Sequence, residues 1–368
     1  MANKKNASIK DVARLSGVSV ATVSRIMNDT GRYSPKTRDK VLKVIEEIGY
    51  ERNSLATSLR INKSNMIGIL VPDIANEFYA SVLKKSEQAL FKLGYSTIIC
   101  NTERSIERET AYYRMLIEHR VDGLISVSSA SNQMPLSAKY AIPIVFIDRD
   151  PHSNSELIVT TNHYAAGKEL AKLLLNQADD LCLVMTKSRP SSTMDRVQAF
   201  KDELAKSKMD TSGRILSLNT TSDKFLQPHP DLKEFIEKKC HKGKRLGVFA
   251  INDNVAYMVL RVADELGLKV PDELIVTGVD GMSIASISQP TITTIVQDST
   301  AIADEASRLL VESIKKRGKK NDYQVLFTFL IDLHRERAHY QKNKIQLKYR
   351  YKLFEDWCCF FVCVRVHI

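Results

Sequence analysis

Acidic, amide and aromatic side chains follow several short apolar runs, and together they have the chemistry of a small-molecule site. The acids and amides are Asp73, Asn76, Asn101, Asp148, Asn252 and Asp280, and Phe78 and Arg149 add an aromatic ring and a guanidinium. Carboxylates, amides and a guanidinium hydrogen-bond hydroxyl groups, and an aromatic face stacks on C–H groups. The set is typical of a sugar site, although a single Asp or Asn after a strand often only caps the next helix.

The apolar runs before these residues predict buried parallel strands. They occupy 67–71, 96–100, 123–127, 142–148, 181–185, 214–218, 246–252 and 274–280. Helical periodicity predicts helices near 77–93, 105–119, 163–176, 192–206, 230–240 and 253–267. Two such series predict an α/β core of two doubly wound parallel-sheet lobes. Ligands of these sheets bind at the carboxyl ends of strands, where the polar residues lie.

A second chemistry is predicted near the N-terminus. Apolar side chains there predict two short helices with one shared core, namely Val12, Ala13, Val18, Val23 and Ile26. Gly17 can end the first helix, and Ser19 can cap a second that begins at Val20. Helix, tight turn and capped helix is the spacing of a helix-turn-helix, so an all-α DNA-binding domain is predicted.

The second of these helices would enter the major groove of double-stranded DNA. Its candidate DNA-contacting residues are Val20, Ala21, Thr22, Ser24, Arg25 and Asn28. Val20, Ala21 and Arg25 are expected at base edges, and Thr22 and Ser24 near phosphates. Arg25 could bind guanine with both ends of its guanidinium, a contact worth roughly 1–3 kcal/mol of discrimination.

A third helix is predicted between Ser34 as its cap and Gly49 as its end, with Pro35 in its first turn. The expected buried stripe is Val41, Leu42, Ile45 and Ile48. Four basic residues remain for phosphates: Lys36, Arg38, Lys40 and Lys43.

The charge distribution agrees with a DNA-binding N-terminus. Of the net charge of +11, residues 1–62 carry +6 and residues 339–368 carry +4, which leaves +1 for 63–338. A small basic segment on a near-neutral body suggests a polyanionic partner for the segment. No signal peptide or run of about 18 apolar residues is seen, so a cytoplasmic protein without a membrane span is predicted.

Catalytic and metal-binding motifs are missing from the sequence. The six cysteines form no CxxC pair, and GxSxG, P-loop and HExxH motifs do not occur. His163 and His241 are interpreted as surface or helix-cap residues. We therefore predict no enzyme, no metal site and no cofactor. A transport-type solute-binding protein would fit the body, but it would need an export signal and no DNA-binding segment.

Residues 8–59, with IKDVARLSGVSVATVSR, YSPKTRDKVLKVIEEIGY and NSLATSLR, resemble the head of the LacI/GalR family of repressors. The resemblance extends to about residue 338. It implies a core like periplasmic binding proteins, a homodimer on a palindromic operator, and a small-molecule effector. It also implies that NSLATSLR is a hinge that enters the minor groove, with Asn53 and Ala56 in its pattern and Leu59 as the apolar wedge. Arg52 stands where the family usually has proline.

The resemblance also assigns effector residues. MDRVQAF at 194–200 resembles the segment whose arginine contacts effector, which points to Arg196. The stretch 249–281 points to Asn252 and Asp280, and Phe78 lies in the segment that resembles the first ligand loop. Three departures concern the effector: Ala199 replaces glycine, Val279 replaces an aromatic residue, and 186–192 lacks the usual glycines.

These observations predict a repressor of carbohydrate transport or catabolism genes with a sugar-like effector. A nucleobase or nucleoside effector, or a phosphoprotein corepressor, stays open as an alternative, as does induction against corepression. The expected boundaries are 1–52 for the DNA-binding domain, 53–65 for the hinge and linker, and 66–338 for the core. Its first lobe covers about 66–161 and 291–325, and its second about 162–290 and 326–338. Residues 339–368 have no recognised family counterpart and are interpreted as a shifted-frame or read-through end.

Overall fold

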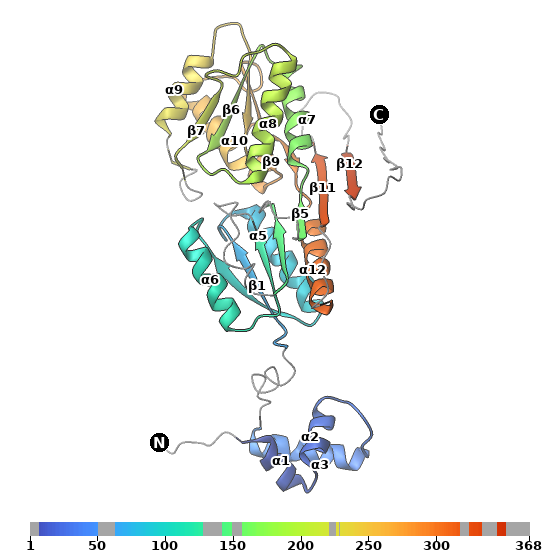
Figure 1. The fold of residues 1–368 in the computed structure, drawn as a ribbon. Helices are drawn as coiled ribbons and strands as arrows, with labels where there is room; N and C mark the ends of the chain where they lie inside the picture. Colours follow the sequence, from blue (N-terminus) through green and yellow to red (C-terminus); the bar gives the residue numbers. More distant parts are fainter. Residues whose placement is uncertain are drawn as a thin grey trace, which may run out of the picture. The chain divides into compact units, whose positions relative to one another are not determined.

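The chain divides into two structural units, Met1–Ser64 and Asn65–Ile368, here called the head and the body. The computed structural model describes residues 7–50, 63–127, 142–148, 157–220, 226–227, 229–316, 324–332 and 344–350, the last two ranges as backbone strands. Figure 1 shows helices alone in the described part of the head, and strands alternating with helices in the body.

The head consists of α1 (Ile9–Ser16), α2 (Val20–Met27) and α3 (Pro35–Ile48). The predicted ends of these helices are confirmed. Gly17 ends α1 in the left-handed conformation at φ 65°, where a side chain would be strained. Ser19 and Ser34 cap α2 and α3 by accepting hydrogen bonds from the backbone N–H groups of Thr22 and Thr37.

The three helices share one small core. It consists of Val12, Ala13, Val23, Ile26, Val41 and Val44. The predicted stripe of α3 was partly wrong, because Leu42 is 39% exposed. Leu42 lies about 100° around the helix from Val41, whereas Val44 lies one turn along on the same face.

The body begins with a first lobe of five parallel strands. They are β1 (Met66–Val71), β2 (Ser96–Asn101), β3 (Gly123–Val127), β4 (Ile144–Ile147) and β5 (Leu157–Thr160). Their order in the sheet is β2-β1-β3-β4-β5. Helices α5 (Glu77–Lys92), α6 (Ile106–Glu118) and α12 (Ser299–Lys315) pack on this part of the sheet. The strand β2 was predicted to be buried, but it lies at the edge and three of its six residues are half-buried and two exposed.

The second lobe repeats this architecture. Its strands are β6 (Asp180–Thr186), β7 (Ile215–Leu218), β8 (Leu246–Ala250), β9 (Leu274–Asp280) and β10 (Thr293–Val296), in the order β10-β9-β8-β6-β7. The helices of this lobe are α7 (His163–Leu175), α8 (Ser191–Lys206), α9 (Pro230–Lys239), α10 (Asp253–Glu265) and α11 (Ser283–Ile287). The predicted fold class is confirmed in both units.

Three segments connect the lobes. The chain passes from β5 into α7, returns from β10 into α12, and then forms β11 (Gln324–Asp332). The strand β11 pairs in parallel with β5 through 324–327 and antiparallel with β10 through 330–332. Because β10 pairs with β9, the return to the first lobe follows Val296, a few residues after the expected 291. A strand β12 (Lys344–Arg350), from the segment without a recognised counterpart, pairs antiparallel with β11.

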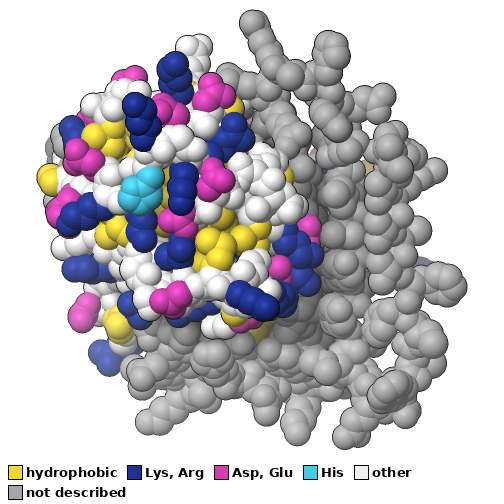
Figure 2. Space-filling view, turned by 90° about the horizontal axis from the view of Figure 1, so that it is seen from above, with side chains coloured by type: hydrophobic (Ala, Val, Ile, Leu, Met, Phe, Trp, Pro, Cys, Tyr) yellow, Lys and Arg dark blue, Asp and Glu magenta, His cyan; other side chains and the backbone are white. Residues whose placement is uncertain are grey.

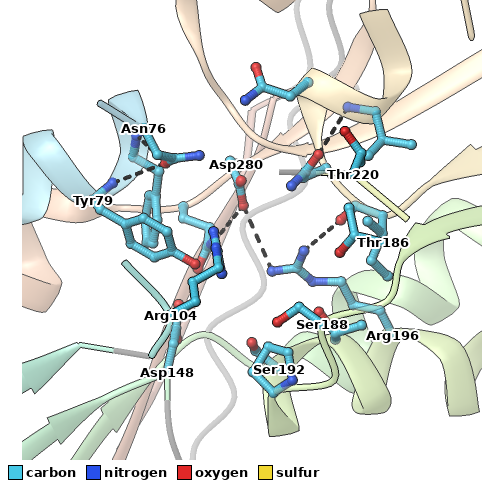
Figure 3. A pocket seen from close by; sticks show the side chains of 18 of the residues that line it. Asn76, Tyr79, Arg104, Asp148, Thr186, Ser188, Ser192, Arg196, Thr220 and Asp280 are labelled. Atoms are coloured by element: carbon cyan, nitrogen blue, oxygen red, sulfur yellow. Dashed lines mark hydrogen bonds and ion pairs between the residues drawn. The ribbon is translucent and has the colours of Figure 1, made fainter. Parts of the chain in front are cut away.

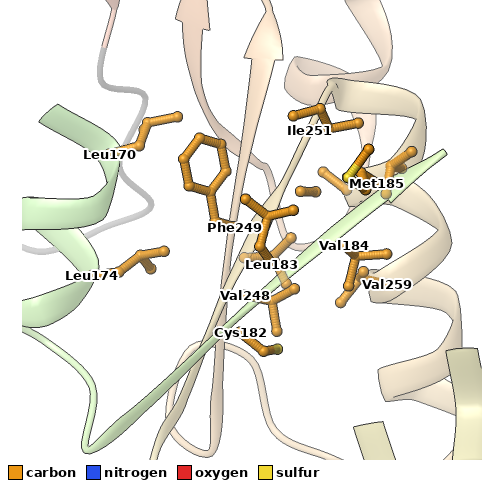
Figure 4. Close-up of a cluster of buried hydrophobic side chains, with 14 of the residues drawn as sticks. Leu170, Leu174, Cys182, Leu183, Val184, Met185, Val248, Phe249, Ile251 and Val259 are labelled. Carbon is orange, nitrogen blue, oxygen red and sulfur yellow. The ribbon is translucent and has the colours of Figure 1, made fainter. Parts of the chain in front are cut away.

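The core of the second lobe holds the strands that reach the functional site. Leu183 and Phe249 point from the sheet towards Leu170 and Leu174 of α7, whereas Val248 lies on the opposite face with Val184 and Val259 (Figure 4). Figure 2 looks down on this lobe and shows basic and acidic side chains interspersed over the described surface. No helix in the described ranges is long and apolar enough to cross a membrane.

One acidic side chain lies inside this core. Asp253, the first residue of α10, is fully buried and accepts hydrogen bonds from Thr294 Oγ1 at 2.5 Å and from the Met282 N–H at 2.7 Å. Burial and the nearby Asp280 carboxyl raise the pKa of Asp253 to about 8. A Cβ at Gly278 would lie 2.2 Å from Asp253 Oδ1, so the close approach of β9 to α10 requires glycine there.

We expect Gly278→Ala to destabilise the body by about 1–3 kcal/mol, because the new methyl group overlaps a buried carboxyl and the α10 backbone. Gly247→Ala on β8 is the matched control, since its Cβ would meet only side-chain atoms, the nearest at 3.1 Å. Differential scanning calorimetry should show the larger loss in Gly278→Ala. Equal losses in the two variants would contradict the assignment.

We also expect Asp253→Asn to change the pH dependence of stability. Between the ordinary pKa of 3.8 and about 8, folded Asp253 holds a proton that the unfolded chain has lost. The free energy of unfolding therefore falls as pH rises through this range, by at most ~1.4 kcal/mol per pH unit from this group. Asn reproduces the protonated acid, so chemical denaturation at pH 5 and 8 should show a smaller fall in the variant. Exposed Asp264→Asn on the same helix is the control and should keep the wild-type fall.

Candidate effector pocket and DNA-binding helix

The predicted DNA-contacting residues of the head lie on the side of α2 away from its core. Val23 and Ile26 are buried, whereas Val20, at 40% exposure, Ala21 and Arg25 are exposed. Exposed apolar and basic groups side by side can meet a base edge in the major groove.

The other predicted residues of α2 hold its two ends. Thr22 Oγ1 lies 2.9 Å from Ser19 Oγ at the N-terminus. Asn28 folds back at the C-terminus, where its Nδ2 donates to Ser24 O at 2.7 Å. The four basic residues predicted for phosphates on α3 are all exposed. Asn53, Ala56 and Leu59 lie outside the described residues.

A pocket in the body is lined by residues of both lobes (Figure 3). The first lobe contributes α5, the loop after β2 and the end of β4, and the second contributes α8, α10 and the ends of β6 and β9. Six of the predicted effector residues line it: Asn76, Phe78, Asp148, Arg196, Asn252 and Asp280. These six residues, which were expected to lie together at the strand ends, therefore lie around one pocket.

Two predicted residues that the structure describes, Asp73 and Asn101, are not among the pocket lining. Asp73 Oδ1 accepts from the Ala75 N–H at 2.9 Å, and Asn101 Oδ1 accepts from the Ile74 N–H at 3.3 Å. Both therefore shape the loop that leads to Asn76. Arg149 lies outside the described residues.

Asn76 and Asn252 each have a second task in the pocket wall. Asn76 caps α5, with its Oδ1 accepting from the N–H groups of Phe78 and Tyr79 at 3.1 and 3.3 Å. Asn252 caps α10 by accepting from the Val255 N–H at 3.0 Å. Asn76 and Asn252 can therefore be both helix caps and ligand-binding residues. The cap uses the amide oxygen of each side chain, and each residue also lines the pocket.

Asp148 is a buried acid with several hydrogen-bond donors. Its Oδ1 accepts from Thr160 Oγ1 at 2.8 Å, from the Thr161 N–H at 3.3 Å, and from His163 Nε2 at 3.0 Å. Burial alone would raise its pKa, but His163, Thr160 and the charge of Arg196 outweigh burial and hold the pKa of Asp148 below its ordinary value. Asp148 is therefore an ionised hydrogen-bond acceptor in the pocket wall.

Asp280 is the second acid of the pocket, and its side chain is 9% exposed. Gln297 Nε2 donates to its Oδ1 at 2.8 Å, and Arg196 Nη2 lies 3.8 Å from the same oxygen. Burial raises the pKa of Asp280, against the opposing effects of Arg196 and Gln297. Both acids have positive φ, 51° at Asp148 and 117° at Asp280, a conformation that is costly for a side-chain-bearing residue and is retained mostly at functional sites.

Arg196 lies beside Asp280 and is linked to Asp148 through the ring of His163. Its Nη1 donates to Ile251 O at 2.6 Å, while Nε and Nη2 lie 3.2 and 3.0 Å from His163 Nδ1. The guanidinium is buried, so these partners and Asp280 replace the water it has lost. On the first-lobe side, Phe78 and Tyr79 lie with ring centroids 5.6 Å apart, and Arg104 lies 5.7 Å above the Tyr79 ring.

The interpretation of His163 as a surface or helix-cap residue was wrong, because His163 is 2% exposed and lies between Asp148 and Arg196. Gln297 was not predicted either. Both residues were missed for the same reason: each follows a short strand of four residues, β5 or β10, that was not predicted. The apolar run LIVT at 157–160, directly before TNH at 161–163, was the signal for His163.

The three departures from the family pattern have different structural settings. Val279 is fully buried in the core of the second lobe, and Ala199 packs against Gly167 of α7. Only the third departure reaches the pocket, where Thr186, Ser188, Pro190 and Ser192 form one wall. This wall replaces the usual glycines by hydroxyl-bearing side chains, which can both donate and accept hydrogen bonds.

A separate polar contact joins the lobes beside the pocket. The carboxylate of Glu77, the first residue of α5, accepts from the Ser283 N–H at 2.9 and 3.0 Å and from Ser283 Oγ at 2.5 Å.

The lining of the pocket consists largely of groups that can bind hydroxyls and amides. Among the described residues, no cluster of His, Cys, Asp and Glu could hold a metal ion.

Comparisons with known proteins agree with both units. Residues 8–53 match the family described as bacterial regulatory proteins, lacI family, and residues 171–332 match a periplasmic binding protein-like domain. The ribose operon repressor of Halalkalibacterium halodurans is 30% identical over 314 residues, which are 84% of this chain and 91% of that protein.

Solved structures show the same fold. The lac repressor dimer bound to operator and the anti-inducer ONPF has a TM-score of 0.76 at 22% identity, covering 89% of this chain and 98% of that one. A LacI family regulator from Enterococcus faecium with bound ribose has a TM-score of 0.61 at 25% identity, covering 72% and 96%. The chain therefore belongs to the lacI family of bacterial regulatory proteins and is a DNA-binding transcriptional regulator.

Proposed function

We propose that this regulator represses genes of carbohydrate transport or catabolism and that a sugar-like effector bound in the body controls its affinity for the operator. The observation that carries the proposal is the two-lobed pocket in which the buried Asp148 and Arg196 lie with Asp280. Two acids, Asp148 and Asp280, and two guanidiniums, Arg104 and Arg196, line the pocket and can hydrogen-bond hydroxyl groups, with neither sign of charge in excess. Phe78 and Tyr79 supply the apolar side that the C–H groups of a sugar require.

D-ribose is the first effector to test. A relative at 30% identity is named a ribose operon repressor, and a structural neighbour was crystallised with ribose. The hydroxyl-bearing wall formed by Thr186, Ser188 and Ser192 agrees with a polyhydroxylated ligand. Nucleobases and nucleosides are the alternative class, and a phosphoprotein corepressor is the alternative mode of control.

We further propose that the regulator binds its operator as a homodimer. Phe91, Leu93 and Ile99 support this, since these large apolar side chains near the edge strand β2 are 72%, 49% and 50% exposed. Apolar surface of this kind commonly marks a protein–protein contact. A two-fold dimer presents two copies of α2, so the operator should be a near-palindrome. Residues 53–59 are proposed as the hinge that enters the minor groove between them.

We expect Arg25→Ala to weaken binding to a specific operator by about 10- to 100-fold, because it removes a base contact worth roughly 1–3 kcal/mol. The operator can be selected from a random-sequence pool with the wild-type protein and the variants compared by fluorescence anisotropy. Arg38→Ala on α3 is the control, and it should weaken specific and nonspecific binding alike and lower the salt dependence. A loss of equal size on specific and random DNA in Arg25→Ala would exclude a base contact.

We expect Arg196→Ala to weaken effector binding by about 10- to 100-fold, since hydrogen bonds to a charged group contribute about 1.5–3 kcal/mol. Thermal shift and calorimetric titration with D-ribose, then with adenosine and adenine, would measure the loss. Exposed Arg189→Ala, in the neighbouring pocket wall but outside the lining, is the matched control. If none of these compounds binds the wild-type protein, the proposed ligand class is wrong.

A further inference from the structure

His163 is buried beneath the pocket and does not line it. Its backbone begins α7 directly after the crossover from β5, so the residue belongs to the connection between the lobes. Its ring touches one group from each lobe, Asp148 at the end of β4 and Arg196 on α8. Both of these groups line the pocket. One side chain of the crossover thus supports two of the charged groups that an effector would meet.

The neighbours of the ring determine its tautomer. Arginine has N–H donors and no acceptor, so His163 Nδ1 must accept from Arg196, which lies at 3.0 and 3.2 Å. The proton of the ring is then on Nε2, which donates to Asp148 Oδ1 at 3.0 Å. A neutral ring with its proton on Nδ1 would place two donors against each other and leave Nε2 without a proton beside the Asp148 carboxylate. The ring therefore orients the guanidinium from one side and the carboxylate from the other.

The contacts of the ring continue into the second crossover. Asp148 also accepts from Thr160 and Thr161 of the first crossover. Thr161 Oγ1 donates to Gln297 Oε1 at 2.6 Å, and Gln297 Nε2 donates to Asp280. Gln297 immediately follows β10, at the return to the first lobe. Hydrogen bonds thus join both crossovers to Asp148, Asp280 and Arg196.

Close packing fixes His163 and Arg196 relative to each other. Gly167, one turn along α7 from His163, lies so near to α8 that a Cβ there would be 3.0 Å from Arg196 Cα and from Arg196 O. The backbones of His163 and Arg196 therefore move together as parts of the second lobe. Asp148, at the end of a first-lobe strand, is the partner whose position depends on the angle between the lobes.

We propose that His163 is a positioning residue that couples occupancy of the pocket to the crossovers between the lobes. The inference rests on the proposed function, since it concerns the effector of the same pocket. A hydroxylated ligand that accepts from Arg196 competes with His163 Nδ1, and one that donates to Asp148 competes with His163 Nε2. Either competition loosens the ring from one lobe. Ligand binding thereby changes the angle between the two lobes that the crossovers allow.

The test compares three full-length variants. His163→Phe has a ring of similar size but neither donor nor acceptor, whereas His163→Gln keeps one of each. Exposed His241→Gln is the control for histidine loss elsewhere. The first measurement is the ratio of operator Kd with and without saturating D-ribose, set beside the Kd for ribose itself. We expect this ratio of operator Kd values to fall at least about fivefold, towards one, in His163→Phe, because allosteric coupling typically corresponds to a 5- to 150-fold effect. His163→Gln should largely restore the wild-type ratio. A purely structural role would change stability in the variants but leave this ratio at its wild-type value, which would overturn the inference.

The second measurement needs no ligand and separates this inference from the proposed function. Nitrogen-15 NMR of histidine-labelled wild-type protein should show His163, assigned by its loss in His163→Gln, with the proton on Nε2. Hydrogen exchange should become faster at 157–163 and 297–299 in His163→Phe and stay unchanged in His241→Gln. A proton on Nδ1, or unaltered exchange at 297–299, would overturn the inference. If ribose, adenosine and adenine all fail to bind the wild-type protein, the proposed function fails, and these two results alone decide the role of His163.

Discussion

Two acidic side chains of the pocket, Asp148 and Asp280, need hydrogen-bond partners, and the middle of the body is organised around this need. An unpaired buried charge costs several kcal/mol, so Asp148 could not stay buried and ionised without donors, and Asp280 needs a partner for its largely covered oxygens. Asp148 obtains its donors from the crossover after β5, and Asp280 obtains its donor Gln297 from the crossover after β10. The residues that donate hydrogen bonds to the two acids are therefore largely residues of the connections between the lobes.

This arrangement gives each polar group of the pocket two tasks. Asn76 and Asn252 cap helices as well as lining the pocket, and Arg196 holds the Ile251 carbonyl as well as facing Asp280. A ligand that binds these groups must share them with the fold. The binding free energy of an effector is consequently spread over the contacts that position the helices and strands around it.

The sequence was sufficient where structure is decided locally. Ser19, Ser34, Gly17 and Gly49 determine the ends of the head helices through contacts within a few residues, and all four were identified. Leu42 was assigned wrongly because a short apolar cluster on α3 offers two possible stripes, and only packing against α1 and α2 selects Val44. In the body, apolar runs followed by acids or amides located most of the pocket lining.

The sequence was insufficient where a residue acts through distant partners. His163 and Gln297 follow four-residue strands, and they meet Asp148 and Asp280 because β5 pairs with β4 and β10 pairs with β9. Spacing along the chain contains no trace of such contacts. Arg196 was identified through the family resemblance, because a single arginine on an amphipathic helix otherwise resembles a surface residue. Residues 53–59 and Arg149 lie outside the described ranges.

The strand β11 limits how the lobes can move. It pairs with β5 near its start and with β10 near its end, and the hydrogen bond between Thr161 and Gln297 holds the other two connections against each other. Three connections fastened side by side resist both sliding and separation of the lobes. Rotation about an axis through the connections is then the least hindered motion. We therefore expect the conformational change of the body to be mainly this rotation, with the effector selecting a position along it.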